Sequence, residues 1–450
     1  MTNDQIIEEI KNYPGKKVKV AVTDIDGILR GKVMHVDKFL SSLEGGFGFC
    51  NVVFGWDSAD VCYDNVEYTG WHTGYPDAEA RLDLSTYRKV PWDGDIPLVL
   101  ADFRDKKDHA LELCPRNLLK KIRKSAADMG YSATFSQEFE WFNFSENSDD
   151  LHDKHFMEPE PITRGMFGYS LLRSSQRSEY FNDLYDLLAK FGVPIEGFHT
   201  ETGPGVYECA LLYSEILEAA DRAVLFKAGV KEIASMHGVV PTFMAKWSDD
   251  YPGCSGHIHQ SLWKDGSNVF CEPKDADGMS EIMKSYLAGL LHCLPHVLPL
   301  LAPTVNSFKR LVEGAWAPTT ITWGIENRTC AVRAIPGSEK STRIEMRVPG
   351  SDTNPYLAMS AVLASGLYGV KNKLKLEIPR VQGNGYAMKD HGVLPANLWE
   401  STQVFKNSKI SNELFGEKFV KHFAATREWE WRQYSKTITD WERKRYFEII

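Results

Sequence analysis

The strands predicted by this sequence come in groups, and long helices separate the groups. Strand patterns occupy residues 17–23, 97–103, 133–144, 197–212, 239–245, 256–263, 329–334 and 342–348. Helical patterns occupy residues 115–129, 179–191, 214–237, 278–298 and 355–371. A regular succession of one strand and one helix would predict a parallel sheet. The observed order instead favours an α+β fold with an antiparallel sheet.

The N-terminal part of the chain predicts a small unit of its own. The strand 17–23 is followed by a turn at Asp26-Gly27 and a second strand, which is typical of a hairpin. Residues 57–86 are rich in Gly, Asp, Tyr and Pro and predict a loop. The sequence changes character at 105–109, before a helix with Pro115 near its start. We therefore expect one domain over residues 1–108 and a second over residues 109–450.

The composition is that of a soluble globular protein. The 450 residues are 43% hydrophobic and 25% charged, with a formal net charge of -9. The eight cysteines are scattered without a Cys-x-x-Cys pair, which argues against a disulfide framework or a zinc cluster and fits a reducing cytoplasm. The N-terminus lacks the pattern of a signal peptide. The longest apolar run, 287–301, is interrupted by His292, Pro295 and His296, so no membrane span is expected.

Residues 306–347 are unusually basic for an acidic protein. The stretch holds seven cationic side chains, Lys309, Arg310, Arg328, Arg333, Lys340, Arg343 and Arg347, against four glutamates. This excess predicts a pocket for a small carboxylate or phosphate ligand and argues against a nucleic-acid partner. The alternative is a set of exposed arginines on alternating strands. Strand alternation would instead put Arg343 and Arg347 on one wall while Ile344 and Met346 enter the core.

Three other segments bring carboxylates and histidines together. Glu138 and Glu140 lie two residues apart on a predicted strand, and Glu201 and Glu208 flank a Gly-Pro-Gly turn. His257 and His259 follow a glycine-rich loop. Each segment alone is as typical of an exposed acidic face or of structural histidines.

Taken together, six of these side chains form an oxygen-rich set with one imidazole. The set consists of Glu138, Glu140, Glu201, Glu208, His257 and Glu345. It suits two Mg²⁺ or Mn²⁺ ions better than Zn²⁺. Beside a polyphosphate-binding arginine set, it predicts phosphoryl transfer driven by ATP. The chain has no Gly-x-x-x-x-Gly-Lys-Ser/Thr loop, so the nucleotide site would be of another design.

The order of these motifs resembles the glutamine synthetase family from about residue 17 to the C-terminus. The resemblance is carried by Glu138-x-Glu140, His199-x-Glu201 with Glu208, Gly-His257-x-His259-Gln-Ser, Asn306-Ser-x-Lys-Arg310-Leu, Asn327-Arg328, Arg333, Arg343-Ile-Glu345-x-Arg347 and Asn354-Pro-Tyr-Leu-Ala. It implies a small N-terminal β-grasp domain and a large catalytic domain whose curved antiparallel sheet and flanking helices form a funnel. It also implies a homo-oligomer of stacked rings, with a dodecamer expected and a decamer as the alternative.

The resemblance implies a role for each matching residue. Glu140, Glu201 and Glu208 would hold a metal ion beside glutamate, and Glu138, His257 and Glu345 a metal ion on the ATP phosphates. Arg310 and Arg347 would bind the α-carboxylate of glutamate, and Arg328 and Arg333 the transferring phosphate. Arg343 would contact the nucleotide phosphates, with His259, Ser261 and Tyr213 near adenosine. The implied reaction passes through a γ-glutamyl phosphate.

The residues expected to bind the attacking nucleophile differ from those of ammonia-using family members. Their flap carries a Glu that helps to bind and deprotonate ammonium, and the matching residue here is Trp316. An indole cannot accept that proton, although its face can attract a cation. The Asp that also binds ammonium is missing from 49–59, where Asp57 is the candidate substitute. The loop before His257 lacks the Asn usually found near glutamate.

These departures predict an ATP-dependent ligase that joins the γ-carboxylate of glutamate to an organic amine. The segment 75–92 also resembles the γ-glutamylpolyamine and γ-glutamylmonoamine branch of the family. The aromatic residues Phe49, Phe54, Trp56, Trp316 and Trp323 favour an alkyl or aryl monoamine, unless they belong to the core. The alternatives are an ammonia-using glutamine synthetase, a γ-glutamylpolyamine synthetase and a non-catalytic family member.

Overall fold

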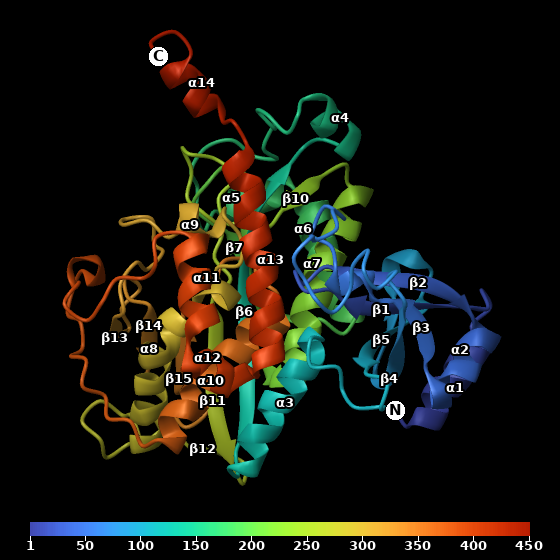
Figure 1. Ribbon diagram of the computed structural model, residues 1–450, viewed down its shortest axis with the longest axis horizontal. Coiled ribbons are helices and arrows are strands. Elements are labelled where there is room, and N and C mark those ends of the chain that lie inside the picture. The colour runs from blue at the N-terminus through green and yellow to red at the C-terminus, as the bar shows by residue number, and fades with distance from the viewer.

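The computed structural model describes residues 1–450 and contains two sheets (Figure 1). The first sheet has the order β2-β1-β5-β4-β3, with the bounds Leu29–His35, Lys17–Thr23, Ile96–Arg104, Asp77–Val90 and Phe47–Cys50. Its pair β1 and β5 is parallel, and the other neighbours are antiparallel. Helices α1 (Asn3–Asn12) and α2 (Val36–Gly45) lie with this sheet, at the right of Figure 1.

The second sheet has the order β13-β14-β15-β11-β6-β8-β7. These strands span Trp323–Ile325, Val332–Ile335, Arg343–Met346, Ile258–Lys264, Ser132–Phe144, Val206–Leu211 and Ile195–Thr200. The short strands β9 (Ser214–Glu215) and β10 (Val240–Thr242) pair with β6, and β12 (Ser267–Asn268) pairs with β11. Every pairing is antiparallel except that of β13 with β14.

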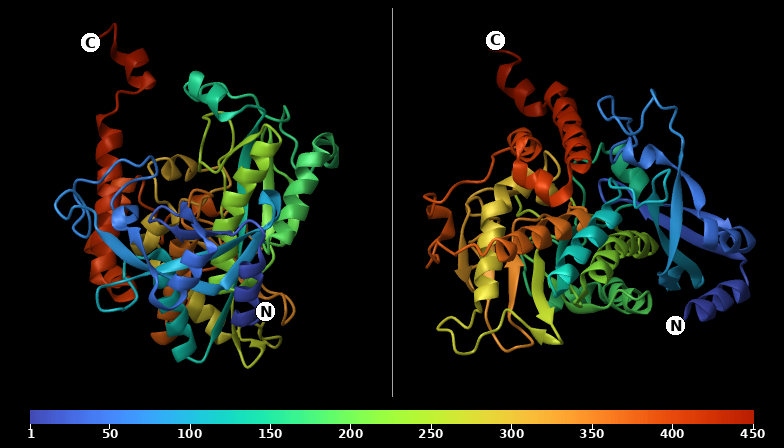
Figure 2. Two further views of the ribbon diagram at one scale, coloured as in Figure 1. Left: turned by 90° about the vertical axis from the view of Figure 1, so that its right-hand side faces the viewer. Right: turned by 60° about the horizontal axis from the view of Figure 1, so that its bottom comes forward.

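Helices surround the second sheet and share one apolar core with it. The longest of them are α3 (Pro115–Asp128), α6 (Ser178–Lys190), α7 (Ile216–Met236), α8 (Glu281–Leu301), α10 (Pro355–Lys371) and α13 (Glu417–Lys436). The shorter ones are α4 (Ser148–Asp153), α5 (Leu171–Gln176), α9 (Ser307–Arg310), α11 (Leu398–Asn407), α12 (Lys409–Phe415) and α14 (Asp440–Tyr446). Figure 2 shows that α14 extends away from the body, and it has no buried residue. No helix combines the length and the apolar character that a membrane crossing requires.

The predicted α+β class and most predicted elements are confirmed. The hairpin is formed by β1 and β2, and the predicted strand 197–212 is the hairpin of β7 and β8. The predicted loop 57–86 is wrong in its last part, because β4 begins at Asp77 and pairs with both β3 and β5. The predicted helix 278–298 begins later and ends later, because Ser280 caps its first turn and the helix continues past Pro295. All eight cysteines are free, as predicted.

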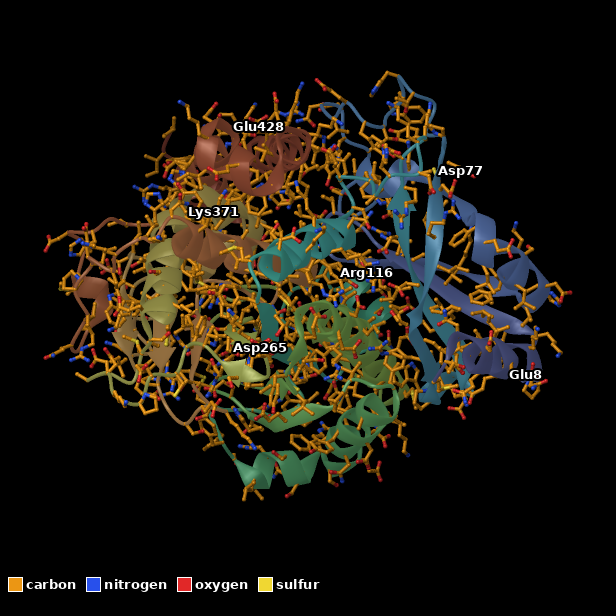
Figure 3. All side chains as sticks on the ribbon, turned by 90° about the horizontal axis from the view of Figure 1, so that it is seen from below. Glu8, Asp77, Arg116, Asp265, Lys371 and Glu428 are labelled. Carbon is orange, nitrogen blue, oxygen red and sulfur yellow. The ribbon has the colours of Figure 1, made fainter.

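A buried ion cluster joins the first sheet to the helices. Arg116 at the start of α3 donates from Nε and Nη2 to Asp221 on α7, at 2.8 Å each. Its Nη1 donates to Asp83 on β4 and Asp102 on β5, at 2.9 and 3.1 Å. Figure 3 shows Arg116 between the first sheet and the helical body. The domain boundary at 108/109 stays a prediction, and this cluster joins residues from both sides of it.

Candidate active site

The strand register gathers the acidic residues on one face of the second sheet. Glu140 on β6 is directly opposite Glu208 on β8, and Glu208 is in turn opposite His199 on β7. Glu138 lies two residues before Glu140 on β6, so both side chains project from the same face. Three strands, β6, β7 and β8, thereby contribute to one site.

The first group of possible metal ligands surrounds Glu345. Ligand atoms of Glu138, His259 and Glu345 all lie within 4.8 Å of one another. His257 joins them, with Nδ1 3.3 Å from Glu345 Oε1 and 3.5 Å from Glu138 Oε2. The structure thus brings together the predicted trio of Glu138, His257 and Glu345. It adds His259, which the sequence interpretation placed near adenosine only.

Positive partners keep the carboxylates of this group ionised. Burial opposes ionisation of Glu345, but His257 and Arg347 outweigh it and lower its pKa to about 2. Burial likewise opposes ionisation of Glu138, and His259 and His257 hold its pKa well below the usual value. Burial and Arg347 lower the pKa of His257 to about 4. Ionised carboxylates with a neutral imidazole form a suitable donor set for a divalent cation.

The second group surrounds Glu208 and has few positive partners. Ligand atoms of His199, Glu201 and Glu208 lie within 4.8 Å of one another. Burial and the neighbouring carboxylates raise the pKa of Glu208 to about 10. Burial is also the main cause that raises the pKa of Glu140 to about 7, although Glu140 Oε2 accepts a hydrogen bond from the Ser255 amide at 2.7 Å. Such crowding of carboxylates fits a site that a divalent cation would neutralise.

His199 was not predicted as a ligand. Its Nε2 lies 3.8 Å from Glu208 Oε2, and its ring stacks on Tyr169 with 4.4 Å between centroids. The signal was its position on β7, two residues before Glu201, which directly follows the strand; this spacing directs both side chains to one face. Tyr169 had no sequence signal, because it belongs to the segment before α5.

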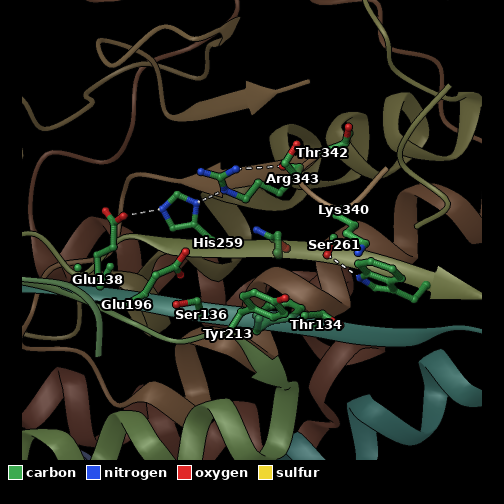
Figure 4. Close-up of a pocket in the computed structure, with 16 residues that line it drawn as sticks. Thr134, Ser136, Glu138, Glu196, Tyr213, His259, Ser261, Lys340, Thr342 and Arg343 are labelled. Atoms are coloured by element: carbon green, nitrogen blue, oxygen red, sulfur yellow. Dashed lines mark hydrogen bonds and ion pairs between the residues drawn. The ribbon is translucent and has the colours of Figure 1, made fainter. Parts of the chain in front are cut away.

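A cavity of about 360 Å³ opens directly beside the Glu345 group (Figure 4). Its lining includes the predicted nucleotide residues Tyr213, His259, Ser261 and Arg343. Arg343 Nε donates to His259 Nδ1 at 3.1 Å, and His259 Nε2 lies 3.0 Å from Glu138 Oε1. A chain of polar contacts therefore leads from the cavity to the possible metal ligands. Lys340, one of the cationic side chains predicted to bind an anion, also lines the cavity, and lining residues that the sequence interpretation missed include Thr134, Ser136, Glu196 and Trp263.

Arg333, also predicted to bind ATP, does not line this cavity. It lies opposite Glu345 in the register of β14 and β15, and its Nη1 donates to Glu345 Oε2 at 3.1 Å. It also pairs with Glu326. Arg333 therefore balances the charge of the first group.

The predicted glutamate-binding arginines are both buried. Arg310 is 2% exposed and donates to the Val348 carbonyl at 2.9 Å and to Ser255 Oγ at 3.0 Å. Arg347 is 4% exposed and donates to Glu345 Oε1 at 2.5 Å and to the Arg328 carbonyl at 3.1 Å. Ser255 contacts both Arg310 and Glu140, so the arginine set and the acidic set are connected.

Trp316 is exposed on the flap that follows α9. Its side chain is 60% exposed, and its backbone has a φ of 58°, in the left-handed region. It lines a cavity of about 670 Å³ together with Glu326, Arg328 and Arg380. The structure therefore places Trp316 beside Arg328, the residue predicted to contact the transferring phosphate.

The other predicted pocket aromatics lie elsewhere. Phe54 is fully buried in the core of the first sheet, and Phe49 packs edge-on against Phe103 there. Trp323 is 5% exposed and donates to the Ile378 carbonyl at 2.7 Å. Trp56 contacts Arg30. These four residues form no pocket with Trp316 in the single chain, because each packs within its own part of the fold.

Asp57, the candidate substitute for the ammonium-binding Asp, is used within its own loop. Its Oδ1 accepts hydrogen bonds from the amides of Ala59 and Val61 at 2.9 and 2.8 Å. An aspartate that stabilises its own turn in this way is common in loops.

Comparison with known proteins places this site in a defined family. A model of the glutamine synthetase catalytic domain matches residues 112–446. Type-1 glutamine synthetase 2 of Dictyostelium discoideum is 53% identical, with 99% of this chain and 86% of that protein covered. Glutamate–isopropylamine ligase of a Pseudomonas species is 37% identical (96% and 95% covered), and γ-glutamylethanolamide synthetase of Streptomyces coelicolor is 34% identical (96% and 92% covered). A solved GmaS–ADP complex superposes with a TM-score of 0.86 at 26% identity, with 99% of this chain and 100% of that chain covered.

Proposed function

The chain belongs to the glutamine synthetase family of ATP-dependent ligases, as its motifs predicted, and on that premise we propose that it joins glutamate to an organic monoamine. The observation that carries this proposal is the exposed indole of Trp316 beside Arg328. An ammonium ion needs a carboxylate to bind it and take its proton, whereas an alkyl or aryl amine gains from an apolar or aromatic contact. Two relatives support the choice, because one is named for the amine isopropylamine and the other for a γ-glutamylethanolamide product.

The proposed reaction has two steps. A γ-carboxylate oxygen of glutamate attacks the terminal phosphorus of ATP, ADP leaves, and a γ-glutamyl phosphate forms. The amine nitrogen then attacks the acyl carbon, phosphate leaves with the electrons of the C–O bond, and the nitrogen loses a proton. Mg²⁺ or Mn²⁺ ions, when bound, would supply positive charge that offsets the repulsion between the carboxylate and the triphosphate.

The residues of the site would divide this work between them. We assign Glu138, His257 and Glu345 to one cation and Glu140, Glu201 and Glu208 to the other, with His259 and His199 as neighbours of the respective groups. Arg310 and Arg347 would orient the α-carboxylate, and Arg328 would stabilise the transferring phosphate. The cavity lined by Tyr213, His259, Ser261 and Arg343 would take the nucleotide, and Arg333 would act through its pairing with Glu345.

Ammonia is the second candidate nucleophile. The 53% identical relative is named a glutamine synthetase, and that name favours ammonia. A polyamine is disfavoured, because the only carboxylate lining the Trp316 cavity is Glu326, and this carboxylate is already paired with Arg333. A second positive charge on the substrate would therefore lack a free partner there.

The test is a phosphate-release assay with glutamate, ATP and Mg²⁺ against a panel of nucleophiles. The panel contains ammonia, isopropylamine, ethanolamine, benzylamine and putrescine. We expect a monoamine to exceed ammonia by at least about tenfold in kcat/KM, because an apolar pocket discriminates by about 1–3 kcal/mol per group. Equal turnover with ammonia would identify a glutamine synthetase. Phosphate release with no member of the panel would favour a non-catalytic role.

We also propose that the protein works as a ring-shaped homo-oligomer in the cytoplasm, with twelve subunits expected and ten as the alternative. Native mass spectrometry of the purified protein distinguishes the two ring sizes from each other and from a monomer.

A further inference from the structure

The loop 350–354 contacts several parts of the active site, although none of its residues has a role in the function proposed above. It begins just after Arg347 and Val348 and ends at the cap of α10. The side chains of Ser351 and Thr353 are fully buried, and Asn354 is 3% exposed. None of these residues lines the nucleotide cavity or belongs to either group of possible metal ligands.

Ser351 lies one hydrogen bond from both the acidic and the arginine set. Its Oγ donates to the Ser255 carbonyl at 2.5 Å and accepts from the Glu140 amide at 3.2 Å. Ser255 in turn donates its amide to Glu140 Oε2 and accepts from Arg310 Nη2. A shift of Ser351 would therefore move the supports of Glu140 and Arg310 together.

The neighbouring residues reach the other side of the site and the first sheet. Asp352 Oδ2 accepts from Ser307 Oγ at 2.5 Å and from Thr304 Oγ1 at 3.0 Å, at the start of the helix that carries Arg310. Asn354 Nδ2 donates at 3.2 Å to the carbonyls of Asp24 and Ile25, in the turn between β1 and β2. The loop thus links Glu140, Arg310 and the first sheet.

One side chain of helix α7 binds the backbone carbonyls of this loop. Lys227, in the middle of α7, donates from Nζ to the Ser351 carbonyl at 2.7 Å and to the Thr353 carbonyl at 3.2 Å. Its ammonium group lies 5.6 Å from the ring centroid of Phe243 and 6.0 Å from that of Phe139. These two carbonyls flank Asp352, so the cation spans the centre of the loop.

We propose that Lys227 is a positioning residue for the glutamate half of the active site. It holds Gly350–Asn354 in the conformation in which Ser351 supports Glu140 and Asp352 supports the helix of Arg310. This inference rests on the proposed function only in assigning Glu140 and Arg310 to the glutamate side. Because the loop does not line the nucleotide cavity, the effect of Lys227 should fall on glutamate and spare ATP.

The test compares Lys227→Met with Lys231→Met, one helical turn further on. Lys231 is exposed and has no hydrogen-bond or ion-pair partner in the structure, so it controls for the same substitution on the same helix. For Lys227→Met we expect the KM for glutamate to rise at least about tenfold, as for other supporting residues, while the KM for ATP stays within about twofold. Lys231→Met should leave both constants unchanged.

A second variant tests the route of the effect. Ser351→Ala should also raise the KM for glutamate, and the double variant Lys227→Met/Ser351→Ala should show less than the product of the two single effects, because both act through one loop. Additive effects, an equal rise of both KM values, or unchanged constants in Lys227→Met would overturn the proposal.

These outcomes are separable from failure of the proposed function. The kinetics use whichever nucleophile the wild-type protein turns over, so a preference for ammonia removes the amine proposal and leaves this one intact. If no nucleophile is used, calorimetric titration of glutamate in the presence of Mg²⁺ and ADP replaces the kinetics. Wild-type protein that binds no glutamate in that titration would overturn both proposals.

Discussion

The two groups of carboxylates in the site lie on the same sheet but differ in what neutralises them. Around Glu345, the protein supplies Arg333 and Arg347 at 3.1 and 2.5 Å and two histidines close by. Around Glu208, the neighbours are Glu140, Glu138 and Glu201, and the nearest imidazole nitrogen is 3.8 Å away. The charges of the first group are therefore balanced by the chain itself, whereas the repulsion in the second is relieved by protonation of Glu208 or would be relieved by a bound cation.

This difference indicates opposite roles in stability. Removing a charge from the Glu345 group leaves buried cations without partners and should destabilise the fold. Replacing a carboxylate of the Glu208 group by a neutral amide relieves repulsion and should not destabilise the fold. Both changes should impair catalysis, so activity and stability together distinguish the two groups.

The largest effect is expected for Glu345→Gln. The amide keeps the size of the side chain but leaves Arg333 and Arg347 without a buried anion, which costs about 3–5 kcal/mol of unfolding free energy. Turnover should fall by at least about 1,000-fold, because a metal ligand and a charge partner are lost together. Phosphate release and thermal unfolding are the two measurements.

Glu339→Gln is the matched control for this variant, because Glu339 is exposed on the turn between β14 and β15. It should leave turnover and Tm unchanged. An active, fully stable Glu345→Gln protein would contradict the assigned role of Glu345 in both respects.

Glu208→Gln should separate cation binding from stability. The affinity for Mg²⁺ or Mn²⁺ should fall about 10–100-fold, in line with the loss of a group that supports a metal site. The Tm without metal should stay the same or rise, because the amide is neutral without a proton, whereas Glu208, with its pKa raised to about 10, must take one up on folding. Calorimetric titration with Mn²⁺ and thermal unfolding in EDTA measure the two quantities. A Tm that falls as far as in Glu345→Gln would remove the distinction between the groups.

A third substitution tests the side of the site from which the nucleophile is proposed to arrive. Trp316→Glu adds an exposed carboxylate beside Arg328. An exposed charge pair contributes up to about 1 kcal/mol, so the ratio of ammonia to amine turnover should rise by up to about fivefold. Trp399→Glu on α11 is the control, since Trp399 is also partly exposed but lies in a different groove. An unchanged ratio in Trp316→Glu would show that Trp316 does not face the nucleophile.

The sequence predicted the possible metal ligands better than their neighbours, for a physical reason. Glu138, Glu140 and Glu208 lie on strands and Glu201 directly follows β7, so the alternation of side chains indicates the face on which each residue projects. Tyr169 and Trp316 lie in segments between elements, with φ of 55° and 58°, so no periodicity indicates where they point. The contacts of Lys227 could not be predicted either. Its position on a helix predicts burial, but it does not predict which loop the side chain binds.

The sequence left the place of the aromatic residues open for a related reason. Phe54 and Trp323 are apolar side chains whose composition fits a pocket and a core equally well, and the structure buries both in the core. Whether such a side chain lines a pocket or enters the core depends on how distant elements pack together. The possible metal ligands avoided this ambiguity because a buried carboxylate requires a partner, and the partner restricts its position.

The last expected difference between the groups is the contribution of Glu208 to the pH dependence of stability. In EDTA, the raised pKa of Glu208, about 10, means that the folded protein holds a proton that the unfolded chain has lost above its ordinary pKa of about 4.3. Stability should therefore fall as the pH rises from 7 to 9, by up to about 1.4 kcal/mol per pH unit. Glu345, with a folded pKa of about 2, changes stability only in acid, where stability is lost as the pH falls.

Lys227 has the opposite effect to Glu208, because burial lowers its pKa to about 7 and stability therefore rises with pH above that value. This effect is the same in wild type and in Glu208→Gln, so the difference between the slopes of the two proteins isolates Glu208. Denaturant unfolding of both proteins at several pH values measures that difference, and saturating Mg²⁺ should abolish it. Equal slopes in EDTA would mean that the carboxylates of the Glu208 group are already neutralised by the fold, as those around Glu345 are.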